Sequence, residues 1–561
     1  MPRTQPQHTG DPEIQRAGNS ASRPTLGAPL FVSVLLLVVV FFGLIRFRLR
    51  EMPLERDEGE YAYSGQLLLQ EIPPYKLAYN MKLPGIYAAY AAILAVFGET
   101  PAGIHVGLIL VNAVTTLLLC LLTARLFGRL AGIVAASSYA LLSTSSSVMG
   151  FEAHATNFVV LPALVGMLLL LTPLQSERPW FFVLSGVFSG TAVLMKQHGI
   201  FFVLFCFLYL VWNDWKRNSG ARAIVRHVAI FASGVILPHA TVCLVLYKAG
   251  VFAEFWFWTV SYAGEYSKMG WHRAVRAFLE NSRGVASPAG PIWILAAVGM
   301  SAPFWSPSVR RQAPFLIGLF LCSFLALCPG AYFRPHYFIL LLPAAAILVG
   351  VAVSSATIEI ACSRKYSSLA IIPMLAFAAS FGYAIVHQRQ SYFSMDPVAV
   401  FQTTYPDSPF VPAVRVADYV KENSSDTARI AVLGSEPEIY FYAKRHSAIG
   451  YLYMYSLIVR QKYTVRMREE MIRELETNRP EYLVYVDVWE SWGERQGGPE
   501  LAAFLLRLRE FMDHGYEKVG VLEIGTMTSD VWGDAAKSYL PHSSKVMYVL
   551  KRTQPAAGSS P

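Results

Sequence analysis

Long apolar segments recur along roughly the first 390 residues, and most are close to the ~20 residues that a helix needs to cross a membrane. Eleven of them predict membrane-spanning helices, near residues 26–45, 102–124, 131–149, 154–172, 180–195, 199–213, 227–247, 288–305, 313–329, 335–354 and 367–386. A further apolar run, 84–97, has only about 14 residues and predicts an interfacial or re-entrant helix. The pattern is typical of a polytopic α-helical membrane protein.

A different pattern follows the last apolar segment. Residues 388–552 alternate short apolar runs with amphipathic segments, which predicts a soluble α/β domain. The expected strands are Ala428–Leu433, Tyr482–Val486, Val519–Ile524 and Lys545–Leu550, and the expected helices are Leu457–Leu475 and Glu500–Met512. Ser435 with Glu438 fits a helix capping box, and ligand binding is the alternative. Both ends of the chain, 1–25 and 553–561, are polar and predict disorder.

Composition and charge agree with a membrane domain over residues 26–387. Charged residues make up only 15% of the 561, where a soluble protein carries roughly a quarter. With a cytoplasmic N-terminus, basic loops at 125–129, 214–227, 310–311 and 364–365 fall inside, as the positive-inside rule requires, although Arg46, Arg48 and Arg50 fall outside. The odd number of spans then predicts an extracytoplasmic α/β domain. The net charge of +9 is thereby explained without nucleic acid, and the six cysteines show no disulfide or metal-binding spacing.

The first outer loop, residues 46–101, carries the densest polar chemistry. Three carboxylates, Asp57, Glu58 and Glu60, begin a helical segment, and Asp57 shares a helix face with Tyr61 four residues later. A carboxylate beside the membrane could take a proton from an attacking hydroxyl. The alternative is that Asp57 and Glu60 cap the helix.

Cations and imidazoles in the other outer loops are predicted on the same membrane face. Lys82 and Arg334 could bind phosphate oxygens, or they could be membrane-edge residues whose charged heads reach water. The other polar side chains expected there are Glu152, His154, Lys196, His198, His336 and Tyr337. The span interiors are nearly free of ionisable residues, whereas a transporter would place them near the midplane.

These motifs resemble those of the GT-C glycosyltransferases. The similarity rests on the acidic segment 57–62, Pro73-Pro74-Tyr75, Lys82-Leu83-Pro84 and 334–338 with Leu342-Pro343, and it covers roughly residues 26–390. The chain is similar to the bacterial branch of the protein O-mannosyltransferase and aminoarabinose transferase superfamily, families 39 and 83. It departs from them at Leu83, where a proline is usual, and at Met81, where aminoarabinose transferases carry a metal-linked glutamate.

The resemblance implies an inverting transfer from a polyprenyl-phosphate sugar on the extracytoplasmic face. It makes Asp57 the general base and Lys82 the lysine that binds the donor phosphate, and it places Glu152 where relatives often carry a second acidic residue. Glu58 is expected as a further catalytic carboxylate, and Arg334 and Tyr337 as further residues that bind the donor phosphate. Substrate contacts are expected from Tyr61, His154, Lys196, His198 and His336. No cofactor is implied with certainty, and a divalent metal stays open.

The sequence therefore predicts a multi-pass glycosyltransferase of the bacterial inner membrane that modifies a lipid, glycan or protein of the envelope. A lipid-linked sugar flippase or transporter is the main alternative. A membrane anchor that presents the outer domain to a partner is another, but it leaves the carboxylates and Lys82 unexplained.

Overall fold

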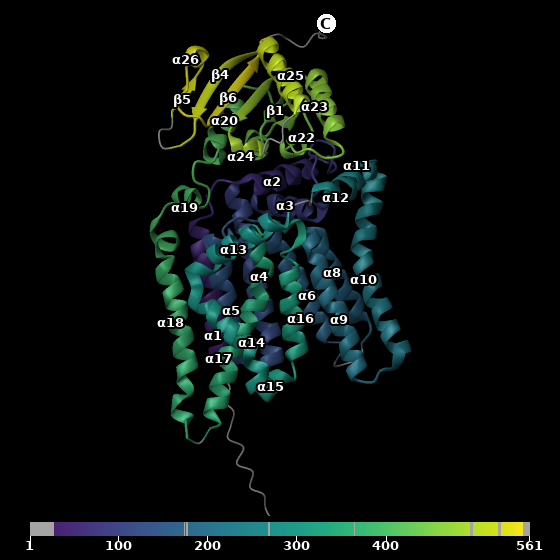
Figure 1. Cartoon of the computed structure of the whole chain (residues 1–561), viewed down its shortest axis with the longest axis vertical. Helices are drawn as coiled ribbons and strands as arrows, with labels where there is room; N and C mark the ends of the chain where they lie inside the picture. The colour runs from purple at the N-terminus through teal and green to yellow at the C-terminus, as the bar shows by residue number, and fades with distance from the viewer. Residues whose placement is uncertain are drawn as a thin grey trace, which may run out of the picture.

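A computed structural model describes residues 27–172, 174, 178–266, 270–363, 365–493, 498–525 and 529–553. The ends predicted to be disordered lie outside these residues, apart from Thr553. A bundle of long helices makes up most of the molecule, and a smaller unit with a β-sheet covers one end of it (Figure 1). The fold is thus a polytopic membrane bundle with a soluble α/β domain, as predicted.

Each of the eleven predicted spans contains a helix. They are α1 (Ala28–Arg48), α4 (Pro101–Phe127), α5 (Arg129–Ser143), α6 (Ala155–Leu171), α8 (Trp180–Met195), α9 (Ile200–Lys216), α10 (Gly220–Lys248), α14 (Gly290–Trp305), α16 (Ala313–Leu325), α17 (Leu342–Ala361) and α18 (Ile372–His387). Within the described residues, seven helical segments are long and apolar enough to cross a membrane, while α5, α6, α8 and α16 are shorter apolar helices. The bundle encloses its own apolar core, in which α17 is buried along most of its length.

Several predicted span ends differ from the helix ends, and two of the differences shape the outer loops. The third span was expected to reach residue 149, but α5 ends at Ser143 and the chain continues into a short 3-10 turn. The tenth was expected from residue 335, but Pro335–Leu340 forms a 3-10 segment, η6, and the α-helix begins at Leu342. In both places polar or proline residues interrupt the apolar run and direct the chain towards the outer loops.

A layer of short helices lies between the bundle and the soluble domain. It contains α2 (Arg56–Leu69) and α3 (Pro84–Phe97), and α3 coincides with the predicted interfacial helix. A second hydrophobic cluster runs from α2 and α3 into the β-sheet, so the domain packs directly on this layer (Figure 1). The α10–α14 connection adds α11 (Phe252–Trp256), the π-helix η3 (Phe257–Tyr262), α12 (Ala263–Tyr266) and α13 (Trp271–Ala286).

The soluble domain is built on a six-stranded sheet of order β2-β1-β3-β6-β4-β5. Its strands are β1 (Arg429–Leu433), β2 (His446–Ser447), β3 (Tyr482–Asp487), β4 (Tyr516–Glu523), β5 (Asp530–Trp532) and β6 (Val546–Arg552). β1 pairs in parallel with β2 and β3, and the β3–β6, β6–β4 and β4–β5 pairs are antiparallel. The four predicted strands are confirmed, whereas β2 and β5 are too short to show a periodic pattern.

Helices flank this sheet. They are α20 (Phe410–Glu422), α21 (Glu438–Ala443), α22 (Tyr455–Ile458), α23 (Thr464–Asn478), α24 (Trp489–Trp492), α25 (Pro499–Gly515) and α26 (Asp534–Ser538). Helix α19 (Pro397–Thr404), which precedes them, packs against the core of the bundle (Figure 1). The predicted helix at 457–475 is two helices, α22 and α23, and the one at 500–512 is α25. The Ser435–Glu438 capping box is wrong, because Pro437 is the N-cap of α21 and Ser435 Oγ bonds to Ser491 instead.

Candidate active site

The acidic motif begins helix α2, and a different carboxylate from the predicted one caps it. Glu55 is the N-cap: its side chain accepts the Glu58 N–H at 2.9 Å, and Glu58 Oε2 accepts the Glu55 N–H at 3.4 Å. This reciprocal pair is a capping box that satisfies two of the free N–H groups at the helix start. The capping role considered for Asp57 with Glu60 is therefore wrong, and both of these side chains are free for other contacts.

Asp57 and Glu60 share one cation. Lys82 Nζ lies 2.7 Å from Asp57 Oδ1 and 2.6 Å from Glu60 Oε2, and it stands 4.5 Å from the centre of the Tyr61 ring. The Asp57 side chain is 19% exposed and the Glu60 side chain is 0% exposed. Asp57 is therefore the carboxylate of the pair that a bound substrate can reach.

The electrostatics of this cluster separate the two carboxylates. Burial by itself would raise the pKa of Asp57, but the attraction of Lys82 outweighs it and holds that pKa well below its ordinary value. Burial raises the pKa of Glu60, with the nearby Asp57 charge acting in the same direction against Lys82. The two carboxylates raise the pKa of Lys82, which stays charged although it is buried.

Glu58 and Glu152 are placed away from the cavity, in the packed layer beneath it. Glu58 is fully buried, and its Oε1 accepts the Ala153 N–H at 2.7 Å and lies 3.2 Å from His105 Nε2. Glu152 is also buried, and neither of its oxygens has a hydrogen-bond partner among the described residues. Burial, together with the nearby Glu58 carboxylate, raises the pKa of Glu152 to about 8. Both side chains thus lie behind Asp57 and outside the cavity lining.

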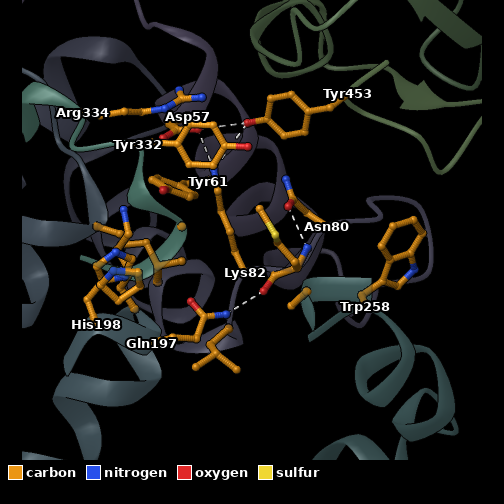
Figure 2. A pocket seen from close by; sticks show the side chains of 18 of the residues that line it. Asp57, Tyr61, Asn80, Lys82, Gln197, His198, Trp258, Tyr332, Arg334 and Tyr453 are labelled. Atoms are coloured by element: carbon orange, nitrogen blue, oxygen red, sulfur yellow. Dashed lines mark hydrogen bonds and ion pairs between the residues drawn. The ribbon is translucent and has the colours of Figure 1, made fainter. Parts of the chain in front are cut away.

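A cavity of about 270 Å³ opens beside Asp57, between the helix layer, the bundle and the soluble domain (Figure 2). Eight of the predicted site residues line it: Asp57, Tyr61, Lys82, Lys196, His198, Arg334, His336 and Tyr337. They come from four separate parts of the chain, and the fold brings them to one place. The other lining residues include apolar side chains such as Leu83, Ile86 and Met195, and aromatic ones such as Trp258 and Tyr453.

Two further cations, Lys196 and Arg334, line this cavity together with Asp57. Lys196 Nζ lies 4.3 Å from the centre of the Tyr337 ring, and the Arg334 guanidinium lies 5.7 Å from that of Tyr332. Burial lowers the pKa of Lys196 to about 7, and the positive charges of Lys82 and Arg334 act in the same direction. A bound anion would reverse this shift, because it favours the charged amine. Lys196 and Arg334 both line the cavity and carry the positive charge that suits an anionic group.

A second cavity, of about 370 Å³, lies on the other side of Asp57. It shares Arg56, Asp57, Arg334 and His336 with the first, so Asp57 faces both. Its remaining lining residues are Glu55, Met149, His154, Pro335, Tyr405, Pro406, Asp407, Ser408, Pro409, Phe410 and Glu490. The soluble domain and the segment that leads into it contribute seven of its fifteen lining residues.

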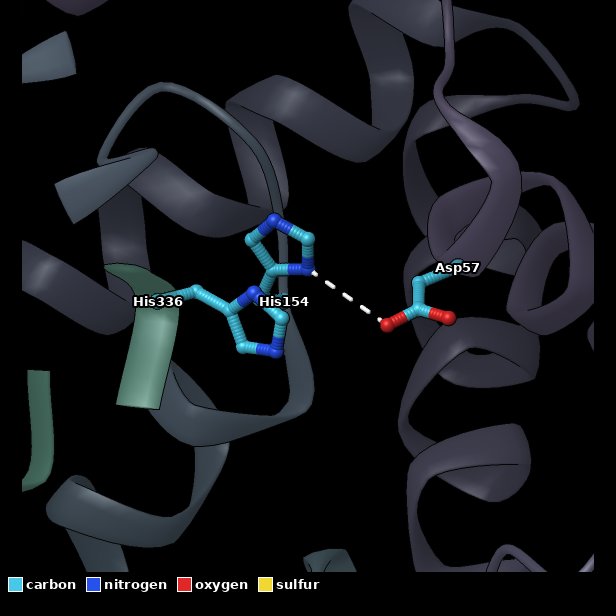
Figure 3. Close-up of side chains that lie close together, drawn as sticks. All are labelled: Asp57, His154 and His336. Atoms are coloured by element: carbon cyan, nitrogen blue, oxygen red, sulfur yellow. Dashed lines mark ion pairs between the residues drawn. The ribbon is translucent and has the colours of Figure 1, made fainter. Parts of the chain in front are cut away.

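Asp57, His154 and His336 form a group that could hold a metal ion (Figure 3). One ligand atom from each lies within 4.8 Å of the others, and the two imidazoles stack with ring centres 4.1 Å apart. Both ring nitrogens of His154 and Nδ1 of His336 are buried without a hydrogen-bond partner among the described residues. Burial lowers the pKa of His154 to about 4, which keeps the neutral form that binds metals. The donors fit a divalent ion of the zinc class.

Sequence reasoning missed two residues of the centre. Glu60 was named among the three carboxylates of the motif and as a possible cap, but not as a residue of the site. Tyr453 was not named, although its hydroxyl lies 2.7 Å from Glu60 Oε2 and 3.3 Å from Asp57 Oδ1. Nothing in the local pattern around a tyrosine in the soluble domain indicates contact with a loop nearly 400 residues earlier.

Comparison with known proteins gives a consistent picture. A family model for dolichyl-phosphate-mannose-protein mannosyltransferases matches residues 82–241. The crystal structure of ArnT from Cupriavidus metallidurans bound to undecaprenyl phosphate has a TM-score of 0.55 at 15% identity, with 95% of this chain and 100% of that chain covered. The archaeal oligosaccharyltransferase AglB from Archaeoglobus fulgidus, in complex with an inhibitory peptide and a dolichol-phosphate, has a TM-score of 0.50 at 13% identity, covering 91% of this chain and 75% of that one.

The apo structure of the same ArnT agrees, with a TM-score of 0.54 at 16% identity over 93% of this chain and 97% of that one. No curated protein sequence matches the chain significantly. At these identities the solved structures establish the fold, which extends over the bundle and the soluble domain alike. The chain therefore has the GT-C fold, and its residues 82–241 match the family model of the mannosyltransferases.

Proposed function

We propose that this chain is an integral membrane glycosyltransferase that moves a sugar from a polyprenyl-phosphate donor to an envelope acceptor, with inversion. The observation that carries the proposal is that Asp57 lines two cavities, together with Arg334 in both and with Lys196 in the first. The solved relatives in the comparison were determined with undecaprenyl phosphate and with a dolichol-phosphate, which are lipid phosphates of this kind.

The leaving group of such a reaction is a lipid phosphate, which needs positive charge more than it needs a proton. Lys196 and Arg334 provide that charge from one wall of the first cavity, and Tyr337 holds the Lys196 side chain by its ring face. Phosphate binding would return Lys196 to its charged form. Lys82 adds positive charge on the Asp57 side of the same cavity.

Asp57 would take the proton of the acceptor hydroxyl. Its lowered pKa keeps it ionised at physiological pH, although it also makes it a weak base. A weak base suffices here because the glycosyl centre passes through an oxocarbenium-like state, in which the attacking hydroxyl becomes acidic as its bond to carbon forms. Asp57 Oδ1 is held by Lys82, so Oδ2 is the oxygen that can accept this proton.

The two cavities give donor and acceptor separate approaches. Inversion requires the acceptor to attack the face of the sugar opposite to the leaving phosphate. We assign the donor to the first cavity, which contains Lys196 and apolar side chains from α3 and α8, and the acceptor to the second. Both meet at Asp57. The soluble domain and its approach supply seven of the fifteen residues that line the second cavity, so acceptor choice would depend in part on that domain.

Asp57, His154 and His336 would hold a divalent metal if the reaction uses one. Such an ion supplies positive charge that polarises an oxygen or stabilises a developing negative charge. The proposal also places the protein in the bacterial inner membrane, with the soluble domain on the extracytoplasmic side, because the predicted basic loops then face the cytoplasm.

The direct test is transfer from a synthetic short-chain polyprenyl-phosphate sugar in detergent, with mass spectrometry of the product. Mass spectrometry of envelope glycans and lipids from cells with and without the protein would identify the acceptor class. We expect the purified protein to release polyprenyl phosphate and to glycosylate an envelope acceptor. A protein that accepts only soluble nucleotide sugars would overturn the lipid-phosphate assignment.

A further inference from the structure

A loop of the soluble domain reaches the catalytic carboxylates. Tyr453, between β2 and α22, places its hydroxyl 2.7 Å from Glu60 Oε2, 3.3 Å from Asp57 Oδ1 and 3.2 Å from the Arg56 carbonyl oxygen. Lys82 Nζ lies 3.5 Å from the same hydroxyl. In Figure 2, Tyr453 points from the domain towards Asp57 and the end of the Lys82 side chain. One tyrosine of the domain thus contacts every charged member of the cluster.

Hydrogen bonds join the Tyr453 loop to the segment around Ser435, and the start of α2 bonds to that same segment. The Met454 N–H donates to Ser435 Oγ at 3.0 Å, and Ser435 Oγ donates to the Ser491 carbonyl within the domain. Arg56, the residue before Asp57, donates through Nε to the Ser435 carbonyl at 2.6 Å and pairs with Glu436 at 3.1 Å. The same domain segment therefore fixes the Tyr453 loop and the start of α2. The position of Tyr453 relative to the carboxylates of α2 is therefore fixed by this segment.

The Tyr453 hydroxyl has a single proton to donate, and the distances indicate which oxygen accepts the hydrogen bond. The shortest contact is to Glu60, which also accepts the Tyr87 hydroxyl at 2.6 Å and pairs with Lys82. Three groups thus fix the fully buried Glu60 carboxylate, which in turn holds Lys82 against Asp57 Oδ1. The chain of contacts runs from the domain through Tyr453, Glu60 and Lys82 to the carboxylate that faces the cavities.

We propose that Tyr453 is a positioning residue for the transfer reaction, which the soluble domain contributes to orient Asp57 through Glu60 and Lys82. The soluble domain then helps to position the catalytic carboxylate, in addition to lining the proposed acceptor cavity. This inference rests on the proposed glycosyltransferase function and deepens it.

The experiment compares two tyrosine substitutions in the same segment. Tyr453→Phe removes the hydroxyl bound to Glu60. Tyr451→Phe is the matched control, because its hydroxyl also bonds to a glutamate, Glu470 at 2.9 Å, at a place outside the cavity lining. Losing a hydrogen bond to a charged group should lower kcat of Tyr453→Phe roughly tenfold or more, with donor KM within about twofold of wild type. Tyr451→Phe should keep the wild-type kcat and KM.

A double-mutant cycle tests the route through Glu60. In a Glu60→Gln background, adding Tyr453→Phe should lower kcat by less than about threefold, because the two residues act as one unit. Additive losses, or a raised donor KM with unchanged kcat, would contradict a positioning role. If the wild type transfers sugar and Tyr453→Phe behaves like Tyr451→Phe, the inference fails while the proposed function stands. A wild type that transfers no sugar from lipid phosphate would overturn both.

Discussion

Residue 57 owes its properties to its neighbours rather than to its position at a helix start. Glu55 and Glu58 satisfy the N-terminus of α2, so Asp57 has no capping duty and its carboxylate turns to Lys82 and the cavities. Lys82 lowers its pKa, and burial alone would have raised it. The four carboxylates of this segment therefore have different roles. Glu55 and Glu58 cap the helix, Glu60 pairs with Lys82, and Asp57 lines the cavities.

Replacing Asp57 by asparagine should abolish transfer while the protein still folds and inserts. The amide has nearly the same volume but cannot accept the proton, so we expect a loss of about 10²- to 10⁴-fold in kcat. Glu51→Gln is the control, since Glu51 is an exposed acid of the same loop. Steady-state transfer in detergent measures both variants. Near-normal turnover by a well-expressed Asp57→Asn protein would remove Asp57 from the mechanism.

Lys196→Ala and Arg334→Ala should weaken use of the lipid-phosphate donor. Each removes a charge from the cavity, and a lost charged contact to phosphate costs about 1.5–3 kcal/mol, or roughly 10- to 150-fold in donor KM. Lys82→Ala should also lower kcat, because it leaves Asp57 and Glu60 without their shared cation. Lys76→Ala, an exposed lysine of the same loop, should change neither value. Full activity of the first two variants would remove them from the phosphate site.

Donor affinity should fall as pH rises through the pKa of Lys196. In the free protein this pKa is about 7, and a bound phosphate raises it, so phosphate binds most tightly to the charged amine that predominates below pH 7. We therefore expect donor KM to be constant below about pH 7 and to increase above it. Lys196→Arg keeps its charge throughout this range and should remove the increase. A pH-independent KM in the wild type would show that Lys196 does not bind the donor.

At the scale of elements, the contact between α2 and α21 decides how the soluble domain sits on the catalytic loop. A Cβ added at Gly59 would lie 2.5 Å from the Glu438 backbone nitrogen and 2.8 Å from its Cα. Backbone atoms cannot move aside as a flexible side chain can, so only glycine permits this approach. The same approach brings the Ser435 carbonyl within hydrogen-bond distance of Arg56.

Gly59→Ala should therefore weaken the docking of the domain. Forcing an extra methyl group into this contact should cost about 1–3 kcal/mol and lower both the thermal stability in detergent and kcat. Gly284→Ala is the matched control, a helix glycine of α13 with no atom within 4 Å of an added Cβ. It should be neutral or slightly stabilising, by about 0.5–1 kcal/mol. Equal melting temperatures for the two variants would show that the α2–α21 contact is not tight in solution.

At the scale of the whole molecule, the candidate site lies between the bundle and the soluble domain, and both line it. The first cavity takes residues from the bundle loops, from α2 and α3, and from the 453–456 segment of the domain. The chain comparisons support this arrangement, since they extend over the domain as well as the bundle. The site is therefore a property of the complete chain.

This arrangement predicts that the soluble domain lies outside the cytoplasm. A reporter fused after about residue 400 should be active only on the extracytoplasmic side, because the basic loops predicted to face inwards fix the orientation of the spans. A fusion to the loop at 214–227, between α9 and α10, should report the opposite side. Cytoplasmic activity of the C-terminal fusion would reverse the topology and remove the extracytoplasmic assignment of the site.

The sequence by itself determined the features that depend on local composition. Hydropathy and segment length gave the eleven membrane helices, the short helix α3 and the four longer strands, because apolar surface favours lipid or core wherever it occurs. Counting loops then predicted that Asp57, Lys82, Lys196 and Arg334 would lie on one face, and they line one cavity. Span ends were less certain, since prolines and polar residues end an α-helix before its apolar run is finished.

Only the tertiary structure decided which polar side chains meet. It assigned the helix cap to Glu55, buried Glu58 and Glu152 behind the cavity, paired Lys82 with two carboxylates and brought Tyr453 to Asp57 across 396 residues of chain. Hydropathy is an average over neighbouring residues and does not indicate which distant side chain a residue contacts. The partner of a side chain depends on how helices far apart in the sequence pack, and that packing places charges to within a few ångströms, the range over which they set one another's pKa.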